Sequence, residues 1–176
     1  MNWHVERRLF LVALGILVSD QATKLLVTRN LEFHEERVLL DGFFKLVHWG
    51  NTGAAWSLFH GNNLVLALVS GVALLALFFY RRHFGTDTAL GQISVGLLFG
   101  GIIGNLIDRL RVDHVIDFIR FYVRRRESGV ELGFPAFNIA DIAICVGVGL
   151  LFLMSWREST VPEKPAQAPA PGEGSK

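Results

Sequence analysis

Apolar residues collect in four long blocks that are separated by polar stretches. A helix that crosses the hydrocarbon core of a bilayer needs about 20 largely apolar residues. The second and fourth blocks reach this length with almost no charge, whereas the first and third reach it only if polar residues at their ends lie within the membrane. The pattern predicts an α-helical integral membrane protein with four transmembrane helices, at about residues 9–27, 63–80, 90–108 and 139–156.

The first block also has features of a cleaved signal peptide, because Arg7 and Arg8 precede its apolar run. No small-x-small cleavage site follows that run, and the polar stretch Asp20–Lys24 stands there instead. We therefore interpret the first block as a retained membrane helix.

Composition supports a membrane protein and excludes several other classes. The 176 residues are 51% hydrophobic and only 19% charged, and the mean hydropathy is +0.40, which argues against a disordered chain, a coiled coil or a typical soluble domain. The net charge of +1 gives no indication of a nucleic-acid partner. A single cysteine, Cys145, excludes an internal disulfide framework and a cysteine-based zinc site.

Four spans place the two long connections, residues 28–62 and 109–138, on one side of the membrane, with both termini and the short connection 81–89 on the other. The termini side carries six basic residues near the membrane and the long-loop side nine. By the positive-inside rule this count favours long loops in the cytoplasm. Arginines engaged in a folded site do not report on orientation, so composition alone leaves the orientation open.

The C-terminal stretch 158–176 differs from the rest of the chain, because it holds four of the five prolines together with Ala, Gly, Glu and Lys. Such a segment cannot bury enough apolar surface to offset the entropy of ordering it. We predict a disordered Pro/Ala-rich tail there, and a single four-helix membrane domain over residues 1–157.

The first long connection contains a stretch rich in aromatic and β-forming residues, Asp41–Trp49, which predicts a short strand and turn. Its aromatic residues and those just after it suit the water–lipid interface; they are Phe43, Phe44, Trp49, Trp56 and Phe59. An interfacial anchor and a substrate cradle are both open interpretations of this segment.

Polar residues near the ends of the first and third spans form two patterns. Asp20 and Lys24 stand four residues apart on one helix face, as an ion pair that is either structural or chemical. The third span carries a small-residue row that allows another backbone to approach closely; the row is Gly96, Gly100 and Gly104, continued by Asp108. Asn105 and Arg109 share another face of that helix.

Two further carboxylates adjoin apolar sequence on the long-loop side. Asp117 has apolar neighbours on both sides, and a salt bridge to an arginine is one interpretation of it. Pro135 and Asn138 mark a helix start, and with Asn138 as N-cap the side chain of Asp141 falls at N3, near a capping box. Two adjacent carboxylates cannot both ionise easily, so the pair also suits acid–base hydrolysis by an aspartate dyad.

Other chemistry finds little support in the residues. Asp113, His114 and Asp117 have no known zinc-site spacing, and no metal or cofactor is expected. Membrane carboxylates also occur in ion- or proton-coupled transporters, which is the rival interpretation. Transporters usually show repeats and sites at the bilayer midplane, neither of which is evident here.

Five segments in order resemble the successive motifs of lipoprotein signal peptidase, or signal peptidase II: Asp20–Lys24 (DQATK), Asn51–Ser57 (NTGAAWS), Gly100–Arg109 (GGIIGNLIDR), Val115–Phe118 (VIDF) and Phe134–Asp141 (FPAFNIAD). The resemblance implies four transmembrane helices with a small β-cradle and a short interfacial helix on the outer face. It also implies an aspartic endopeptidase that removes the signal peptide of diacylglyceryl-modified prolipoproteins, cutting before the lipidated cysteine.

By the same resemblance, Asp117 and Asp141 are the catalytic dyad, and Asp20 and Lys24 support it. The residues implied to line or shape the site are Asn51, Gly53, Asn105, Arg109, Asn138 and Ala140. The implied partners are the prolipoprotein, membrane lipid and globomycin-like cyclic peptide inhibitors. The implied location is the bacterial cytoplasmic membrane, with both termini cytoplasmic and the site near the outer face, which reverses the orientation favoured by the charge count.

Two features depart from the family pattern. A basic stretch, Arg124–Gly133, lies between the two aspartates like an insertion, and it leaves the loop geometry unpredicted. Trp56 stands where the family more often has phenylalanine.

Overall fold

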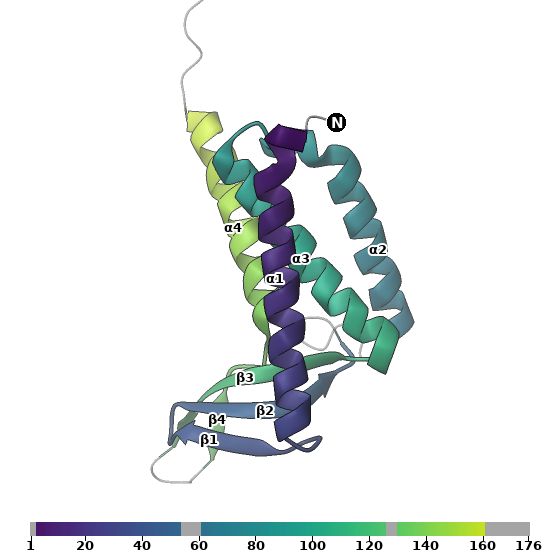
Figure 1. Ribbon diagram of the computed structural model, residues 1–176. Helices are drawn as coiled ribbons and strands as arrows, with labels where there is room; N and C mark the ends of the chain where they lie inside the picture. The colour runs from purple at the N-terminus through teal and green to yellow at the C-terminus, as the bar shows by residue number, and fades with distance from the viewer. Residues whose placement is uncertain (1–2, 54–60, 126–129, 161–176) are drawn as a thin grey trace, which may run out of the picture.

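A computed structural model describes residues 3–53, 61–125 and 130–160, which form four long helices and a small sheet at one end of them (Figure 1). The helices are α1 (Trp3–Asn30), α2 (Asn63–Tyr80), α3 (Ala89–Val112) and α4 (Ile139–Thr160). All four are long and apolar enough to cross a membrane, by length and composition. The predicted helical membrane class is confirmed, and α1, α3 and α4 extend beyond the predicted spans.

The sheet consists of β1 (Glu36–Leu40), β2 (Phe44–Asn51), β3 (Val115–Arg124) and β4 (Glu131–Gly133), in the order β1-β2-β3-β4 with every pair antiparallel. It lies across the lower end of the bundle, while the N-terminal end of α1 and the C-terminal end of α4 lie at the upper end (Figure 1). The sequence predicted one strand, which β2 matches. The strands that pair with it depend on contacts distant in sequence.

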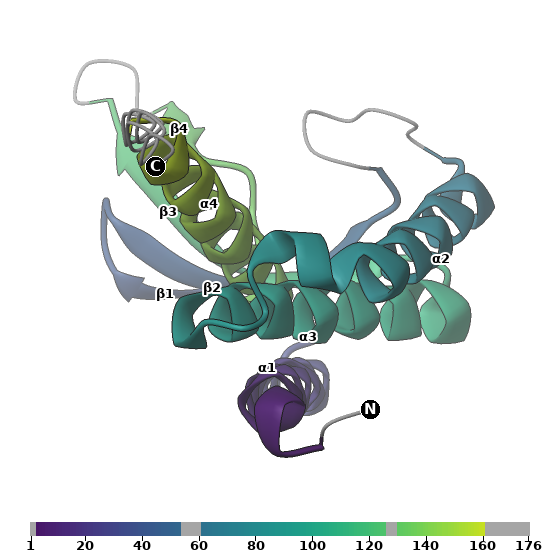
Figure 2. The same cartoon turned by 90° about the horizontal axis from the view of Figure 1, so that it is seen from above.

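Helix α3 is the centre of the bundle, with α1 on one side and α2 and α4 on the other (Figure 2). The predicted glycine row faces α1. A Cβ added at Gly96 would lie 2.7 Å from the Leu9 carbonyl oxygen, and one at Gly100 would lie 2.6 Å from that of Ala13. On another face, a Cβ at Gly101 would lie 2.6 Å from the Ala140 carbonyl oxygen of α4. Glycine therefore permits backbone contact on two faces of α3.

The short connection between α2 and α3 contains the 3₁₀-helix η2 (Arg81–Phe84), followed by Gly85 in the left-handed region and the N-cap Thr88. It lies at the end of the bundle opposite the sheet. The interfacial helix expected beside the sheet has no counterpart among the described residues. Residues 54–60, which include Trp56 and Phe59 and connect β2 to α2, lie outside them.

Helix α4 runs to Thr160, three residues past the predicted domain boundary at residue 157. The rest of the predicted tail, residues 161–176, lies outside the described part of the chain.

Candidate active site

Asp117 lies in the first half of β3, opposite Trp49 of β2, and its side chain is only 3% exposed. Two amides hold its carboxylate. Asn51 Nδ2 donates to Oδ2 at 3.0 Å, and Asn138 Nδ2 donates to Oδ1 at 2.9 Å. Within the described residues its partners are thus amides, and the salt bridge to an arginine considered from the sequence does not form.

Asp141 stands in the first turn of α4, where the predicted capping box is present. The Asp141 N–H donates to Asn138 Oδ1 at 2.9 Å, and the Asn138 N–H donates to Asp141 Oδ2 at 3.2 Å. The other carboxylate oxygen, Oδ1, accepts from Asn105 Nδ2 of α3 at 2.8 Å. Capping therefore fixes the backbone and the side chain of Asp141 together.

Asn138 connects the two aspartates. Its side-chain oxygen caps the helix that begins with Asp141, and its side-chain nitrogen holds Asp117. Burial raises the pKa of Asp117 to about 7, and the negative charge of Asp141 adds to this rise, while the amides of Asn51 and Asn138 oppose it. Asp117 can therefore hold or release a proton near neutral pH.

Behind the aspartates lies a buried ion-pair cluster between α1 and α3. Lys24 Nζ contacts Asp20 Oδ2 at 2.8 Å and Asp108 Oδ2 at 2.6 Å, and it donates to Asn105 Oδ1 at 3.0 Å. The side chains of Lys24, Asp20 and Asp108 are at most 2% exposed. The Asp20–Lys24 pair predicted from spacing is confirmed, and Asp108 joins it because it continues the glycine row that faces α1.

This cluster reaches the backbone next to each aspartate. Asp20 Oδ1 accepts at 3.0 Å from the N–H of Ala140, the residue before Asp141. Asp108 Oδ2 accepts at 3.3 Å from the N–H of Ile116, the residue before Asp117. Lys24 bridges these two carboxylates, so one buried cation links the backbone positions of both aspartates.

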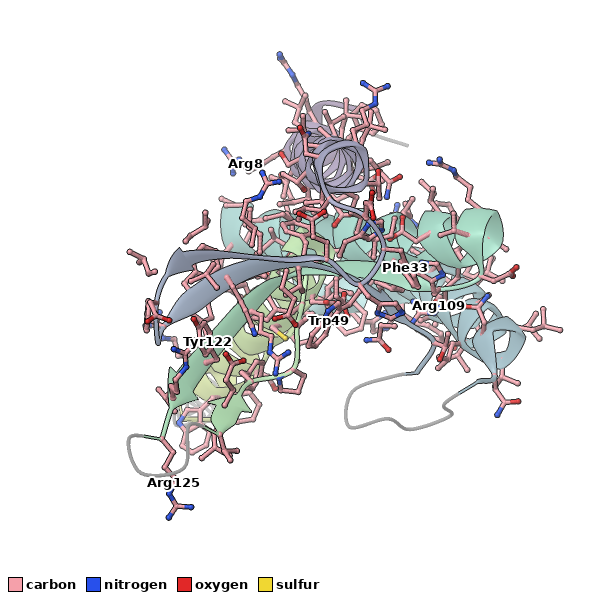
Figure 3. All side chains as sticks on the ribbon, turned by 90° about the horizontal axis from the view of Figure 1, so that it is seen from below. Arg8, Phe33, Trp49, Arg109, Tyr122 and Arg125 are labelled. Atoms are coloured by element: carbon pink, nitrogen blue, oxygen red, sulfur yellow. The ribbon has the colours of Figure 1, made fainter. Side chains whose placement is uncertain are left out.

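The opposite side of the site is a turn at the end of β2. The Gly53 N–H donates to Asn51 Oδ1 at 2.9 Å, and Arg109 Nη2 of α3 donates to the Gly53 carbonyl oxygen at 3.3 Å. Asn63 Nδ2 of α2 donates to the Arg109 carbonyl oxygen at 2.9 Å. Figure 3, viewed from the sheet end, shows Arg109 beside the sheet where β2 leads toward α2.

The ten site residues predicted from the sequence all belong to one hydrogen-bonded network: Asp20, Lys24, Asn51, Gly53, Asn105, Arg109, Asn138, Ala140, Asp117 and Asp141. Sequence reasoning missed the roles of Gln21 and of the Ile116 backbone. Gln21 Nε2 donates to both Asp20 and Asp108, at 3.2 and 3.1 Å. The sequence signal that could have identified Gln21 is its position next to Asp20 in the first motif.

Over residues 3–53, 61–125 and 130–160, no group of three or more His, Cys, Asp or Glu side chains is arranged to hold a metal ion. The chemistry that the site offers is that of two carboxyl groups, one with a pKa near neutrality, held by neutral amides.

Comparison with known proteins identifies the family of this chain. Residues 12–157 match the family described as Signal peptidase (SPase) II. Lipoprotein signal peptidases of Geobacter sulfurreducens and Bacillus subtilis are 41% and 35% identical over 150 residues each, covering 84% and 85% of this chain and 90% and 94% of those proteins. That of Syntrophotalea carbinolica is 39% identical over 155 residues, with coverage of 86% and 92%.

A similar fold has been solved experimentally. A bacterial membrane enzyme determined by the in meso method at 2.3 Å resolution has a TM-score of 0.77 and 26% identity, covering 91% of this chain and 93% of that one. A second such structure, at 1.9 Å, has a TM-score of 0.72 and 27% identity, covering 85% and 93%. The chain belongs to the signal peptidase II family, and it is an aspartic-type peptidase in the form of a bacterial multi-pass membrane protein.

Proposed function

We propose that this protein removes the signal peptide of diacylglyceryl-modified prolipoproteins by hydrolysing the peptide bond before the lipidated cysteine. The observation that carries the proposal is the link through Asn138, which hydrogen-bonds Asp117 with one side-chain atom and caps the helix of Asp141 with the other. The relatives at 35–41% identity are named lipoprotein signal peptidases, which supports the same substrate.

In the proposed reaction the two aspartates share one proton. The ionised carboxylate takes a proton from a water molecule, and the water oxygen attacks the scissile carbonyl carbon. The protonated carboxyl group donates a hydrogen bond to the carbonyl oxygen, which takes up negative charge. The tetrahedral intermediate then collapses, the C–N bond breaks, and the leaving nitrogen receives a proton from the dyad. The pKa of Asp117, about 7, suits a group that alternates between these states.

The other site residues fall into two groups by their contacts. Asn51 and Gly53 form the turn at the end of β2, and Arg109 of α3 donates to that turn; all three are proposed to line the path of the substrate peptide. Asp20, Lys24, Asn105 and Ala140 lie behind the dyad and are proposed to hold its geometry. A lipidated substrate would enter sideways from the bilayer, so that its acyl chains stay in lipid while the peptide meets water at the sheet.

We place both termini in the cytoplasm and the sheet at the outer face, opposite to the simple charge count. The structure gives a reason to discount that count. On the sheet side, Lys45, Arg120 and Arg124 form ion pairs with acidic residues of the sheet and its turn, and Arg109 lies beside the aspartates. Globomycin-like cyclic peptides are expected to inhibit by occupying the same site.

The test is cleavage of a diacylglyceryl-modified prolipoprotein by the purified full-length protein in detergent. We expect wild type to cleave, Asp117→Asn and Asp141→Asn each to lose activity, and a metal chelator to have no effect. The same precursor without the lipid is expected to remain intact. Asp113→Asn is the matched control, because Asp113 is an exposed carboxylate at the end of α3 with left-handed backbone that asparagine tolerates.

Activity that survives in Asp117→Asn or Asp141→Asn would remove that aspartate from the dyad and leave it a structural role. Cleavage of the unlipidated precursor at an equal rate would contradict the proposed specificity. Absence of cleavage by a folded wild-type protein on a confirmed lipidated precursor would contradict the proposed function as a whole.

A further inference from the structure

Asn51, whose amide holds Asp117, is the last residue of β2, and it lies in a short end segment of the sheet. The register of β2 and β3 shifts between Leu46 and Trp49. Three paired positions follow this irregularity, from Trp49 to Asn51. A register shift interrupts the ladder locally, and the end of an element opens more easily than its centre. The Asn51 amide therefore depends on a segment that the rest of the ladder supports weakly.

The middle residue of this segment, Gly50, has an imidazole ring against its backbone. A Cβ added at Gly50 would lie 2.8 Å from His114 Cδ2, 3.0 Å from Cγ and 3.1 Å from Nε2. Gly50 lacks the positive φ that favours glycine, so its backbone conformation would accept another residue. The contact with the ring, and not the backbone conformation, therefore requires glycine at this position.

The alternation of the strands explains how His114 reaches Gly50. Gly50 pairs with Ile116, and His114 stands two residues before Ile116, which makes it the diagonal neighbour of Gly50. Diagonal neighbours share a face of the sheet, and an aromatic side chain can span the distance between them. Asn51 and Asp117 occupy the alternate positions and point to the other face. His114 thus supports the end of β2 from the face opposite to the carboxylate of Asp117.

Further rings connect His114 to the end of α1. Phe33 contacts His114 with ring centroids 5.6 Å apart, and it also contacts His48 of β2 edge-on at 5.3 Å. His48 Nδ1 lies 3.0 Å from the carbonyl oxygen of Leu31, which is buried. The position of the His114 ring therefore depends on both α1 and β2.

The β3 side of the segment is fixed by bonds to two helices. The Ile116 N–H donates to Asp108 Oδ2 of α3 at 3.3 Å, and the Ile116 carbonyl oxygen accepts from Asn138 Nδ2 at the start of α4 at 3.4 Å. Because these bonds hold β3, a movement at the end of β2 would change the distance between the Asn51 amide and its carboxylate.

We infer that the ring of His114 holds the end of β2 against β3 and thereby keeps the Asn51 amide on Asp117. His114 is thus a positioning residue that acts through Asn51. This inference rests on the proposed function, because it takes Asp117 as a catalytic group. A substitution that removes the ring weakens one hydrogen bond and leaves both aspartates in place.

The test follows the titration of Asp117 by ¹³C NMR in the full-length protein, labelled at its aspartate carboxyl carbons and assigned with Asp117→Asn. The Asn51 amide favours the ionised carboxylate, so its loss moves the midpoint to higher pH. The charges of Asp141 and Lys24 also act on this pKa, and every variant retains them. We expect an upward shift of about one pH unit for Asn51→Ala and of about half a unit for His114→Ala. The pH dependence of kcat/KM should move in parallel.

Three further variants separate the contact of the ring from its charge. His114→Phe keeps a flat ring that cannot be charged, and it is expected to keep the wild-type midpoint. Gly50→Ala places a Cβ where the ring lies, so it should shift the midpoint as His114→Ala does, and combining the two should add nothing. In an Asn51→Ala background, His114→Ala should also add nothing, because the amide is already absent.

The matched control is His34→Asn, which removes another ring in contact with Phe33, at 4.2 Å. His34 is exposed and has left-handed backbone that asparagine tolerates. This variant is expected to leave the midpoint of Asp117 in place.

An unchanged midpoint in His114→Ala, even with lower thermal stability, would show a purely structural role and overturn the inference. An equal shift in His114→Phe would do the same, because it would attribute the effect to the imidazole charge. Additive shifts of His114→Ala and Asn51→Ala would show that His114 does not act through the amide. The titration requires no substrate, so its result is separate from the cleavage assay, whose failure would contradict the proposed function instead.

Discussion

Lys24 and Lys45 are both buried lysines held between two carboxylates, and their partners differ in access to water. The Lys24 side chain is 2% exposed, and its partners Asp20 and Asp108 are 0% and 2% exposed. The Lys45 side chain is 3% exposed, whereas Glu36 and Glu131 are 35% and 32% exposed. Water can thus solvate the partners of one lysine and not those of the other.

The two lysines also connect different parts of the molecule. Although burial lowers the pKa of the Lys45 ammonium, the hydrogen bonds to Glu131 and Glu36 outweigh that effect and the pKa is raised. These contacts join β1, β2 and β4 within the sheet. The Lys24 cluster instead joins α1, α3, β3 and α4, and it reaches the residues before both aspartates. We infer that the Lys45 cluster stabilises the sheet, whereas the Lys24 cluster stabilises the active site.

The largest effect is expected for Lys24→Met. It leaves two buried carboxylates without a cation, which typically destabilises a protein by about 3–5 kcal/mol. Thermal unfolding in detergent measures this loss, and peptidase activity should disappear with it. Adding Asp108→Asn should recover part of the stability, because it removes one of the unpaired charges. A Lys24→Met protein as stable as Lys45→Met would contradict the contrast between the two clusters.

The next effect concerns Asn138, through which the buried cluster acts on the dyad. Asn138→Ala removes the cap of α4 and the amide bond to Asp117, so we expect a stability loss of about 1 kcal/mol and an activity loss of about a hundredfold. The matched control is Asn62→Ala, because Asn62 occupies the N-cap position of α2 without a side-chain capping bond. Equal effects of the two substitutions would show that neither the capping bond nor the amide bond of Asn138 contributes.

A smaller effect is expected in the pH dependence of cleavage. The raised pKa of Asp117, about 7, means that the dyad loses its proton as the pH rises through this value, so kcat/KM should fall there. Asn51 donates to the carboxylate and favours its ionised form. Asn51→Ala should therefore move the midpoint to higher pH, whatever its effect on the maximal rate. Asp113→Asn should leave the midpoint in place, and a downward shift in Asn51→Ala would contradict the assignment.

The smallest effect is expected for Lys45→Met. Its glutamate partners can be hydrated and other basic residues lie near them, so we expect a loss of no more than about 1 kcal/mol that diminishes at high salt. Cleavage of a lipidated precursor should be retained. A loss of activity comparable with that of Lys24→Met would show that the ion pairs of Lys45 also control the site.

Sequence spacing predicted the local parts of this site. The Asp20–Lys24 pair and the Asn138–Asp141 capping box each depend on one helical turn, and both are present. The glycine row predicted that Asp108 lies on the packed face of α3, but not which groups it meets. Composition predicted four helices because a transmembrane helix must be long and apolar within its own continuous stretch of sequence, whatever it packs against.

The long-range parts could not be obtained in this way. The pairing of β2 with β3 places Asn51 beside Asp117, although 66 residues separate them, and no local pattern specifies that register. For the same reason, the sequence could not decide whether Asp117 forms a salt bridge with an arginine. The resemblance to a family brought the site residues together where spacing could not, because the residues that meet in space come from five separate stretches of the chain.

The position of Asp141 near the start of the last helix has a consequence for biosynthesis. A ribosome that has produced α1, the sheet strands β1 to β3 and α3 has not yet supplied Asn138 or Asp141. If the proposed dyad is the catalytic group, the half-made chain passes through the insertion machinery with Asp117 but without its partner, and it cannot hydrolyse a peptide bond. Under this proposal proteolytic competence begins only when α4 enters the bilayer, so the order of the motifs along the gene delays activity until membrane integration is nearly complete.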